Sequence, residues 1–280
     1  MTTLLTGGTG KIGIILARLL TDANHSVLLA SRSGKVPEPF KGVAFDWFDR
    51  STWENSFKVD SNIDRIYLVG PSVLNMLSIV KDFIELAITK GVVRFVLVSA
   101  STLPRGGPHM GQVHHYLSER GVEYAVLRPT WFSENFAYTF RQSIRENDTI
   151  ATATGSGRIP FVSVHDIADA AFKALVEDVG HNTEYIVLGP ELYSNEEAAA
   201  LFSDVLGRKI THKQLTDDES KKLWLSFGLD EDYANMMLAA EHLVATGEEE
   251  KLFHSDTPLK FVGTRRLKDY LQANREIWAV

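Results

Sequence analysis

The sequence contains no cysteine, and this absence excludes several kinds of chemistry together. Without thiols the chain forms no disulfide and no iron–sulfur cluster, and it has neither a cysteine nucleophile nor a thiolate metal ligand. The histidines are scattered along the chain rather than spaced four apart beside a carboxylate. We therefore expect no metal site.

Basic charge and long apolar runs are also scarce. The 29 lysines and arginines are outnumbered by 36 acidic residues, and the formal net charge is -7. Nucleic acid needs a basic patch, so it is not an expected partner. No apolar run is long enough to cross a bilayer, and the segment MTTLLTGGTGKIG lacks the features of a signal peptide. We expect a cytoplasmic protein, monomeric or homodimeric, that binds no membrane.

Short apolar segments alternate with helical patterns along much of the chain. Segments rich in Val, Ile, Leu, Phe and Tyr predict strands at 2–5, 26–31, 43–45, 65–69, 94–99, 123–127 and 185–188. Leu77, Val80, Ile84 and Ile88 follow the spacing of one helix face, and Gly91 stands where that helix would end. This alternation indicates an α/β fold, a Rossmann-type doubly wound parallel sheet covered on both faces.

The last hundred residues are poorer in strand patterns and are expected to form a smaller, mainly helical lobe. We predict an NADP-binding core over 1–155, completed by about 160–190, and a substrate lobe over 191–280. Three helices are expected to begin with a capping box, in which a hydroxyl residue precedes a carboxylate by three positions. The pairs are Ser163 with Asp166, Ser194 with Glu197, and Thr216 with Glu219.

A glycine-rich loop, TGGTGKIG, follows the first predicted strand and opens the first predicted helix. The chain must turn tightly there, the backbone must approach a pyrophosphate without a Cβ between them, and the helix start must aim its N–H groups at the anion. A tight turn alone would also use glycine, but the strand–loop–helix context favours dinucleotide binding. The residues expected to contact the cofactor are Gly7, Gly8, Thr9, Gly10, Lys11 and Ile12.

The end of the second strand decides between the two nicotinamide cofactors. NAD-binding proteins usually place Asp or Glu there to hold the ribose 2′-hydroxyl. This chain has Ser31, Arg32 and Ser33 instead. A guanidinium pairs with phosphate through two parallel hydrogen bonds, so the segment favours NADP(H). The alternative is that Arg32 is only a solvated loop residue.

Other strand ends are expected to complete the nucleotide site, because ligands bind at the carboxyl ends of parallel strands. Asp46 and Trp47 follow the third strand and would flank the adenine. A small residue after the fourth strand would let the ribose approach. The residues assigned there are Val69, Gly70 and Pro71, and those after the fifth strand are Ser99, Ala100 and Ser101.

Several blocks resemble the NmrA-like branch of atypical short-chain dehydrogenases, and within it the festuclavine/agroclavine dehydrogenase group of fungal ergot-alkaloid pathways. They include TGGTGKIG, ASRS, FVLVSAS, LRPTWFSEN at 127–135 and IPFVSVHD at 159–166. The resemblance runs across nearly the whole chain. It implies an NADP-dependent oxidoreductase that transfers hydride to an imine or iminium of a prenylated indole alkaloid.

The chain departs from the wider dehydrogenase superfamily in its expected acid–base pair. Most members carry Tyr-x-x-x-Lys after the fifth strand, whereas this chain reads HMGQVHHYLS at 109–118. Related reductases often use a lone lysine in this region, and Met110 occupies that place. Reduction of an iminium gives a neutral amine without a proton donor, so the absence fits such a substrate. It fits a non-catalytic NADP sensor equally well, and a redox-coupled pericyclic cyclase is a third reading.

Three residues are candidates for catalysis, each with a structural alternative. Ser101 would orient a polar group of the substrate, or would only cap backbone at a strand end. His109 would act as a general acid near neutral pH, or would be an exposed loop histidine. Glu134 would stabilise a cationic amine, or would cap a helix or form a surface ion pair.

The resemblance also implies a substrate wall after the sixth strand. Pro129 and Thr130 are expected near the nicotinamide ribose, and Trp131 and Phe132 would stack on a flat indole and attract an iminium through cation–π contact. Hydrophobic core is the alternative for these rings. Met110 and Phe161 complete the substrate assignment.

Overall fold

The computed structural model describes residues 1–279, which fall into two compact units. Unit 1 comprises Met1–Arg128 and Ile167–Tyr185; unit 2 comprises Pro129–Asp166 and the chain from Ile186 onward. The core and lobe expected from the sequence, with boundaries at 155 and 191, stay a prediction.

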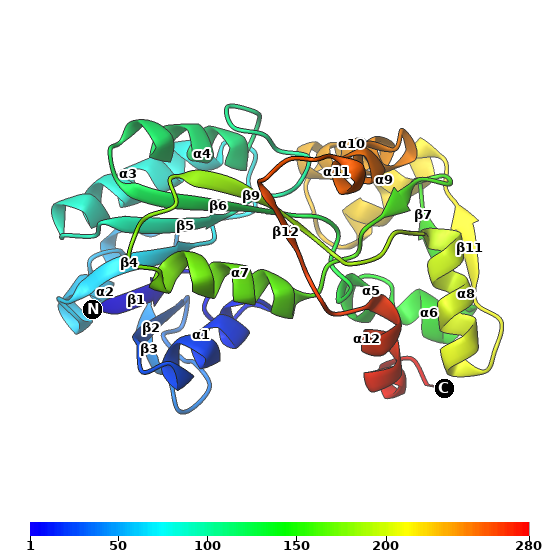
Figure 1. Ribbon diagram of the computed structural model, residues 1–280, viewed down its shortest axis with the longest axis horizontal. Coiled ribbons are helices and arrows are strands. Elements are labelled where there is room, and N and C mark those ends of the chain that lie inside the picture. The colour runs from blue at the N-terminus through cyan, green and yellow to red at the C-terminus, as the bar shows by residue number, and fades with distance from the viewer. Residues whose placement is uncertain (280) are drawn as a thin grey trace. The chain divides into compact units, whose positions relative to one another are not determined.

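One parallel sheet of eight strands carries the fold, in the order β12-β9-β6-β5-β4-β1-β2-β3 (Figure 1). Leu4 in β1 pairs with Leu28 on one side and Ile66 on the other, so the strand order reverses beside β1. Ligands of such sheets bind outside the carboxyl ends of the strands at the reversal. The strands are β1 Thr2–Leu5, β2 Ser26–Ser31, β3 Lys41–Ala44, β4 Ile63–Leu68, β5 Arg94–Val98, β6 Glu123–Pro129, β9 Thr183–Leu188 and β12 Lys260–Val262.

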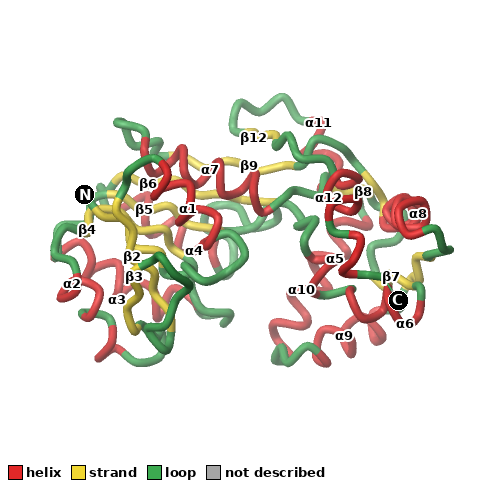
Figure 2. Tube along the Cα trace, turned by 90° about the horizontal axis from the view of Figure 1, so that it is seen from below, coloured by secondary structure: helices red, strands yellow, loops and turns green. Residues whose placement is uncertain are grey.

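Helices cover both faces of the sheet in unit 1 (Figures 1 and 2). The helices α3 and α4 lie on one face, and α1 and α7 lie on the other. Their bounds are α1 Gly13–Asp22, α2 Asn55–Val59, α3 Met76–Thr89, α4 Met110–Glu119 and α7 Val164–Val176. The expected α/β class with a doubly wound parallel sheet is therefore confirmed.

The core of unit 1 forms where the apolar strands meet α3 and α4. Leu4, Ile66, Phe83 and Phe95 are fully buried there. The helix predicted from the spacing of Leu77 to Ile88 is α3, and Gly91, two residues after it, has a φ of 95°. That left-handed conformation suits glycine and ends the helix.

Unit 2 is mainly helical and has its own aromatic core. Phe136, Phe202 and Trp278 are almost wholly buried in it, and the indole N–H of Trp278 donates to the Phe136 carbonyl at 2.9 Å. The remaining elements are α5 Asn135–Tyr138, α6 Arg141–Asn147, β7 Thr149–Thr152, β8 Arg158–Ile159, β10 Tyr193–Ser194, α8 Asn195–Leu206, β11 Thr211–Gln214, α9 Asp217–Ser226, α10 Glu231–Ala245, α11 Glu248–His254 and α12 Leu267–Ala273.

Two of the three predicted capping boxes are present, at Ser194 with Glu197 and at Thr216 with Glu219. The third assignment is corrected, because the buried Asp166 carboxylate binds a distant segment. It accepts from the backbone N–H groups of Thr264 and Arg265, each at 3.2 Å, and from the Arg265 guanidinium at 2.6 Å. The Asp166 carboxylate therefore binds a charged partner far along the chain, Arg265, instead of the backbone at the start of its own helix.

No helix within residues 1–279 is both long enough and apolar enough to span a bilayer.

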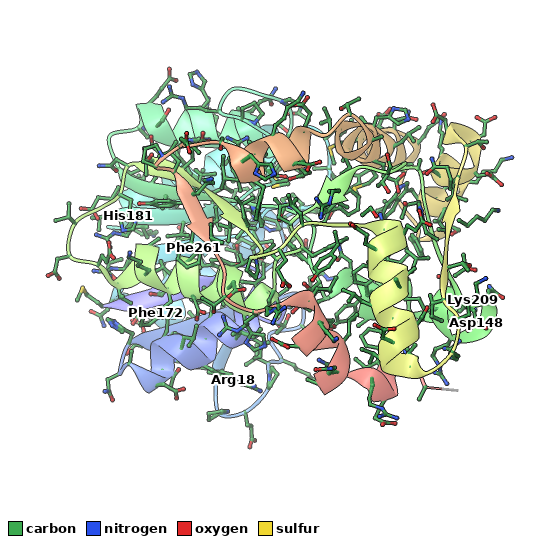
Figure 3. The ribbon with its side chains drawn as sticks, turned by 45° about the vertical axis from the view of Figure 1, so that its right-hand side comes forward. Arg18, Asp148, Phe172, His181, Lys209 and Phe261 are labelled. Atoms are coloured by element: carbon green, nitrogen blue, oxygen red, sulfur yellow. The ribbon has the colours of Figure 1, made fainter. Side chains whose placement is uncertain are left out.

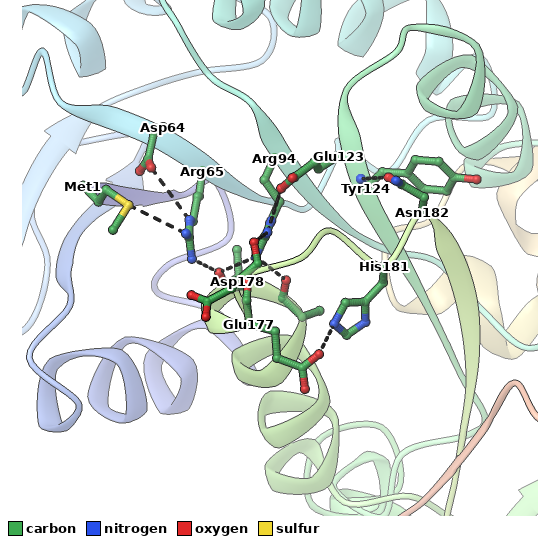
Figure 4. Close-up of polar contacts among 12 residues, drawn as sticks. Met1, Asp64, Arg65, Arg94, Glu123, Tyr124, Glu177, Asp178, His181 and Asn182 are labelled. Carbon is green, nitrogen blue, oxygen red and sulfur yellow. Dashed lines mark hydrogen bonds and ion pairs between the residues drawn. The ribbon is translucent and has the colours of Figure 1, made fainter.

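A buried arginine closes the carboxyl end of α7 (Figure 4). Arg94 is 2% exposed, and its guanidinium donates to the carbonyls of Leu175 at 3.1 Å, Glu177 and Asp178. The Glu123 carboxylate accepts from its Nε at 2.7 Å. The last carbonyls of a helix have no partner within the helix and carry partial negative charge, so one cation satisfies several of them.

We predict that Arg94→Met lowers the free energy of unfolding by about 3 kcal/mol, because it leaves several carbonyls and a carboxylate without their hydrogen-bond donor. The matched control is Arg50→Met, which removes an exposed ion pair with Asp82 and is expected to cost less than about 1 kcal/mol. Urea denaturation of both variants measures the difference. Equal losses would contradict this account of Arg94.

Candidate functional site

The glycine loop between β1 and α1 lies against its neighbours so closely that side chains are excluded. A Cβ on Gly13 would lie 2.0 Å from the Gly7 carbonyl oxygen, and one on Gly7 would lie 2.8 Å from a Val69 methyl. Thr6 holds the loop to the end of β4, because its Oγ1 donates to the Val69 carbonyl at 3.1 Å and accepts from the Val69 N–H at 2.9 Å. The loop therefore presents bare backbone at the point where the strand order reverses.

The turn at the end of β2 carries an exposed, positively charged side chain, that of Arg32. Ser31 and Ser33 both hydrogen-bond the backbone of Lys35, at 2.9 and 3.3 Å, and so shape a tight turn. Arg32 in the middle of that turn is exposed, and within residues 1–279 its guanidinium has no carboxylate or carbonyl partner. The arrangement leaves Arg32 available for an anionic ligand.

The ends of β3 and β4 are tied together by a tryptophan. The Trp47 indole donates to the Val69 carbonyl at 3.1 Å, and its rings meet Phe45 and Phe83 edge to face at 4.9 and 5.2 Å. Asp46 accepts from the Phe48 N–H at 2.9 Å. The residues expected near an adenine thus stand at the carboxyl edge of the sheet, and their contact with a ligand stays a prediction.

The end of β5 carries a buried hydroxyl without a partner. The Ser99 N–H donates to the Leu127 carbonyl at 2.7 Å, but Ser99 Oγ has no hydrogen-bond partner within residues 1–279 although Ser99 is only 5% exposed. A buried polar atom without a partner costs free energy, and such atoms are often completed by water or by a ligand. Ser101 is also buried.

A charged pair that the sequence did not reveal lies beside this turn, and it joins the buried Arg128 to the partly buried Glu184. The Arg128 guanidinium binds the Glu184 carboxylate at 2.9 Å and also donates to the carbonyl oxygens of Ala100 and Ser101. The available signal was a charged residue that follows the apolar stretch Tyr124–Leu127 of strand β6.

A neutral histidine flanks the same carboxylate. His114 is 2% exposed, and its Nδ1 lies 3.5 Å from Glu184 Oε2. Burial lowers the pKa of His114 to about 4, with the Glu184 carboxylate opposing that shift and Arg105, Arg128 and His115 adding to it. His114 is therefore uncharged near neutral pH, and Arg128 is the cation that balances Glu184.

His109 is buried, which corrects the exposed-loop alternative. It is 2% exposed and precedes α4 with a φ of 54° and a ψ of -119°, a conformation uncommon for any residue with a Cβ. Burial lowers the pKa of His109, and a hydrogen bond to the Val73 backbone opposes that shift. A neutral imidazole is a weak proton donor, and the catalytic role of His109 stays a prediction.

In unit 2, the Glu134 carboxylate closes the amino end of α7. One oxygen accepts from Ser163 Oγ and the other from the Val164 N–H, both at 3.0 Å. Negative charge at a helix N-terminus is stabilising, so this contact matches the helix-capping alternative for Glu134. Its catalytic role stays a prediction.

The aromatic residues assigned to substrate lie in different surroundings. Trp131 is half-buried with its ring 6.5 Å from that of Trp224, and Phe132 is half-buried beside Val162. Phe161 is buried in the core of unit 2 against Phe136, so its surroundings favour packing over substrate contact. In unit 1, Met110 is partly buried against the core.

The segment before these rings is fixed to its neighbours. Thr130 is buried, its Oγ1 donates to the Pro160 carbonyl at 2.6 Å, and its N–H donates to the Val187 carbonyl at 3.0 Å. Pro129 is the last residue of β6. Contact of either residue with a cofactor stays a prediction. No cluster of three potential metal ligands is present among residues 1–279.

The family follows from comparison with known sequences. The profile of the NmrA-like family matches residues 109–264. The chain belongs to the NmrA-like family. A festuclavine synthase II of Penicillium roqueforti (strain FM164) is 42% identical to this NmrA-like protein, over 100% of both chains. An agroclavine dehydrogenase of Claviceps fusiformis is 39% identical over 99% of each. The resemblance seen in the sequence is confirmed.

Solved structures confirm the fold of the NmrA-like protein. The NADPH-dependent quinone oxidoreductase QOR2 of Escherichia coli, complexed with NADPH, has a TM-score of 0.77 at 19% identity and covers 98% of this chain and 99% of its own. The triphenylmethane reductase of Citrobacter sp., complexed with NADP(H), has a TM-score of 0.71 at 20% identity, covering 92% and 97%.

We predict that the stability of the protein rises with pH between 4 and 6.5 because of His114. The unfolded chain binds a proton at this histidine below about 6.5, whereas the folded chain does not until about pH 4, so folding is weakened as the pH falls through that window. The contribution reaches about 3 kcal/mol.

Urea denaturation at several pH values measures this dependence. His114→Gln should flatten the slope, whereas His115→Gln, which changes an exposed histidine on the same helix and removes only the smallest of the named causes of the His114 shift, should change the slope much less. Identical slopes for the wild type and His114→Gln would exclude the assignment.

Proposed function

We propose that this NmrA-like protein is an NADPH-dependent oxidoreductase that reduces an imine or iminium of a prenylated indole alkaloid. The observation that carries the proposal is the identity of 42% and 39%, across essentially the whole chain, to a festuclavine synthase and an agroclavine dehydrogenase. A match from end to end supports a common site as well as a common scaffold, whereas a shared fold alone would not indicate a reaction.

The glycine loop fits a dinucleotide. Its backbone is bare because a Cβ on Gly7 or Gly13 would collide with neighbouring atoms, and the loop opens α1, whose N–H groups favour an anion. Gly7, Gly8, Thr9, Gly10, Lys11 and Ile12 would hold the pyrophosphate.

Arg32 fits the phosphate that distinguishes NADP from NAD. The exposed guanidinium stands between Ser31 and Ser33 at the end of β2, and no carboxylate stands in that turn to hold a ribose 2′-hydroxyl. A 2′-phosphate would gain charge-assisted hydrogen bonds from this segment. Asp46 and Trp47 would flank the adenine.

The nicotinamide end would meet the later strand ends. The unpartnered Ser99 hydroxyl supports this placement, because a polar ligand group would complete it. Within unit 1, Val69, Gly70, Pro71 and Ala100 would form the rest of that surface. Contact of Pro129 and Thr130 with the cofactor is part of the same proposal.

Bound NADPH supplies a hydride to an electrophilic carbon. When the acceptor is an iminium, the added hydride turns a C=N⁺ bond into a neutral amine, and the charges balance without a proton from the protein. The chain's own groups agree with this requirement: burial lowers the pKa of His109, and both Glu134 oxygens accept hydrogen bonds at the start of α7. The protein would bind, orient and exclude water, with Trp131 and Phe132 facing the cationic ring.

Deuterium transfer tests the reaction directly. The purified protein is incubated with NADPH labelled at either face of nicotinamide C4 and with an iminium prepared from a prenylated indole amine. We expect one label, and not the other, to appear in the product amine by mass spectrometry. Tight NADPH binding without transfer to any imine would indicate a sensor, and a product with a new carbon skeleton in place of the simple reduced amine would indicate a redox-coupled cyclase; both outcomes would overturn the proposal.

We predict that Arg32→Ala weakens NADPH binding about tenfold to a hundredfold while leaving NADH binding within about twofold, because only NADPH carries the 2′-phosphate. Arg18→Ala is the matched control, since Arg18 is an exposed arginine on α1 of the same unit (Figure 3). Nicotinamide fluorescence titration measures both affinities. An equal loss for the two cofactors would contradict a 2′-phosphate contact.

A further inference from the structure

We propose that Arg128, held by Glu184, is a positioning residue that fixes the turn Ser99–Ser101 in the conformation that receives the dinucleotide. The proposal rests on the proposed function only for the identity of the ligand. The pair itself, the turn and their contacts all lie within unit 1.

The Arg128 side chain makes contacts to two different groups from one buried guanidinium. Arg128 is 7% exposed, and its Nη1 donates to Glu184 Oε1 at 2.9 Å. Its Nε donates to the Ala100 carbonyl and its Nη2 to the Ser101 carbonyl. A planar guanidinium presents its donors in a rigid fork, so fixing one edge on a carboxylate fixes where the other donors point.

The turn that Arg128 holds begins with a buried hydroxyl that lacks a hydrogen-bond partner. Ser99 Oγ is buried and has no partner within residues 1–279, and Ser99 lies at the carboxyl end of β5, where ligands of parallel sheets bind. The backbone of this turn is otherwise held by the Ser99 N–H bond to Leu127 and by the Leu103 N–H bond to Ala100. Arg128 is the side chain that adds donors to its carbonyls.

Glu184 is required because a buried guanidinium without a counter-charge is costly. His114 touches the same carboxylate at 3.5 Å, but its lowered pKa keeps it uncharged near neutral pH. Arg128 and Glu184 therefore balance each other's charge. The guanidinium N–H groups that do not bind Glu184 donate to the carbonyls of the turn.

A second arginine–glutamate pair at the other end of β6 supplies the control. Arg94 and Glu123 are joined at 2.7 Å, but the remaining donors of Arg94 bind carbonyls at the end of α7 (Figure 4). Both pairs are buried on the arginine side and share strand β6. Arg128 holds the turn at Ser99–Ser101, whereas Arg94 holds the end of α7. A comparison of the two pairs therefore separates an effect on the turn from a general loss of stability.

The experiment compares Glu184→Gln with Glu123→Gln by amide hydrogen exchange in the cofactor-free protein and by NADPH fluorescence titration. Glu184→Gln should speed exchange of the Ser99 and Leu103 amides about tenfold and weaken NADPH binding about tenfold. Glu123→Gln should speed exchange at the end of α7 and leave both readouts of the turn within about twofold.

A double variant keeps the test decisive if a lone charge prevents folding. Arg128→Met with Glu184→Met replaces the pair by apolar side chains, which buried pairs often tolerate, yet it removes the donors to Ala100 and Ser101. We expect a folded protein with the same fast exchange and weak NADPH binding.

Two results would bear differently on the two proposals. Slow exchange at Ser99 and Leu103 in both Arg128–Glu184 variants would overturn the positioning role, whatever the cofactor does. Failure of the wild type to bind NADPH would overturn the proposed function, while the exchange data would still decide whether Arg128 holds the turn.

Discussion

The close packing of the glycine loop against the strand ends is the constraint on which the site depends. Gly13 stands where any Cβ would enter the Gly7 carbonyl, and Gly8 stands where one would enter Leu29 of β2. The loop can therefore lie flat across the ends of β2, β1 and β4, and helix α1 can begin directly beside the sheet. The turn carrying Arg32 and the loop after β4 follow strands that the glycine loop touches. Trp47 is joined to the same place by its hydrogen bond to the Val69 carbonyl.

Much of the fold could be predicted because it depends on patterns of residues that are close together in the sequence. The apolar runs indicated seven of the eight strands of the main sheet to within a residue or two, but not β12, and the spacing of Leu77 to Ile88 indicated α3. Capping boxes at Ser194 and Thr216 were predictable because both partners lie within one helical turn. Asp166 shows the limit of such reasoning: its spacing from Ser163 suited a capping box, but Arg265 lies 99 positions away and captures the carboxylate.

The candidate site likewise has a part that could be predicted from the sequence and a part that could not. The glycine loop and Arg32 were visible because their residues are consecutive and follow recognisable strands. The Arg128–Glu184 pair was not visible, since its members are 56 positions apart and only the folded sheet brings them together. Burial of His109 and Phe161 was equally hidden, because a sequence pattern shows that a side chain is apolar or ionisable but does not show which neighbours enclose it.

The backbone at His109 has a consequence for the segment that precedes α4. A residue with a Cβ held at a φ of 54° and a ψ of -119° stores strain of about 1–3 kcal/mol, which glycine at the same position would relieve. The enclosed imidazole, which is 2% exposed, therefore has to be held by its neighbours strongly enough to offset that strain.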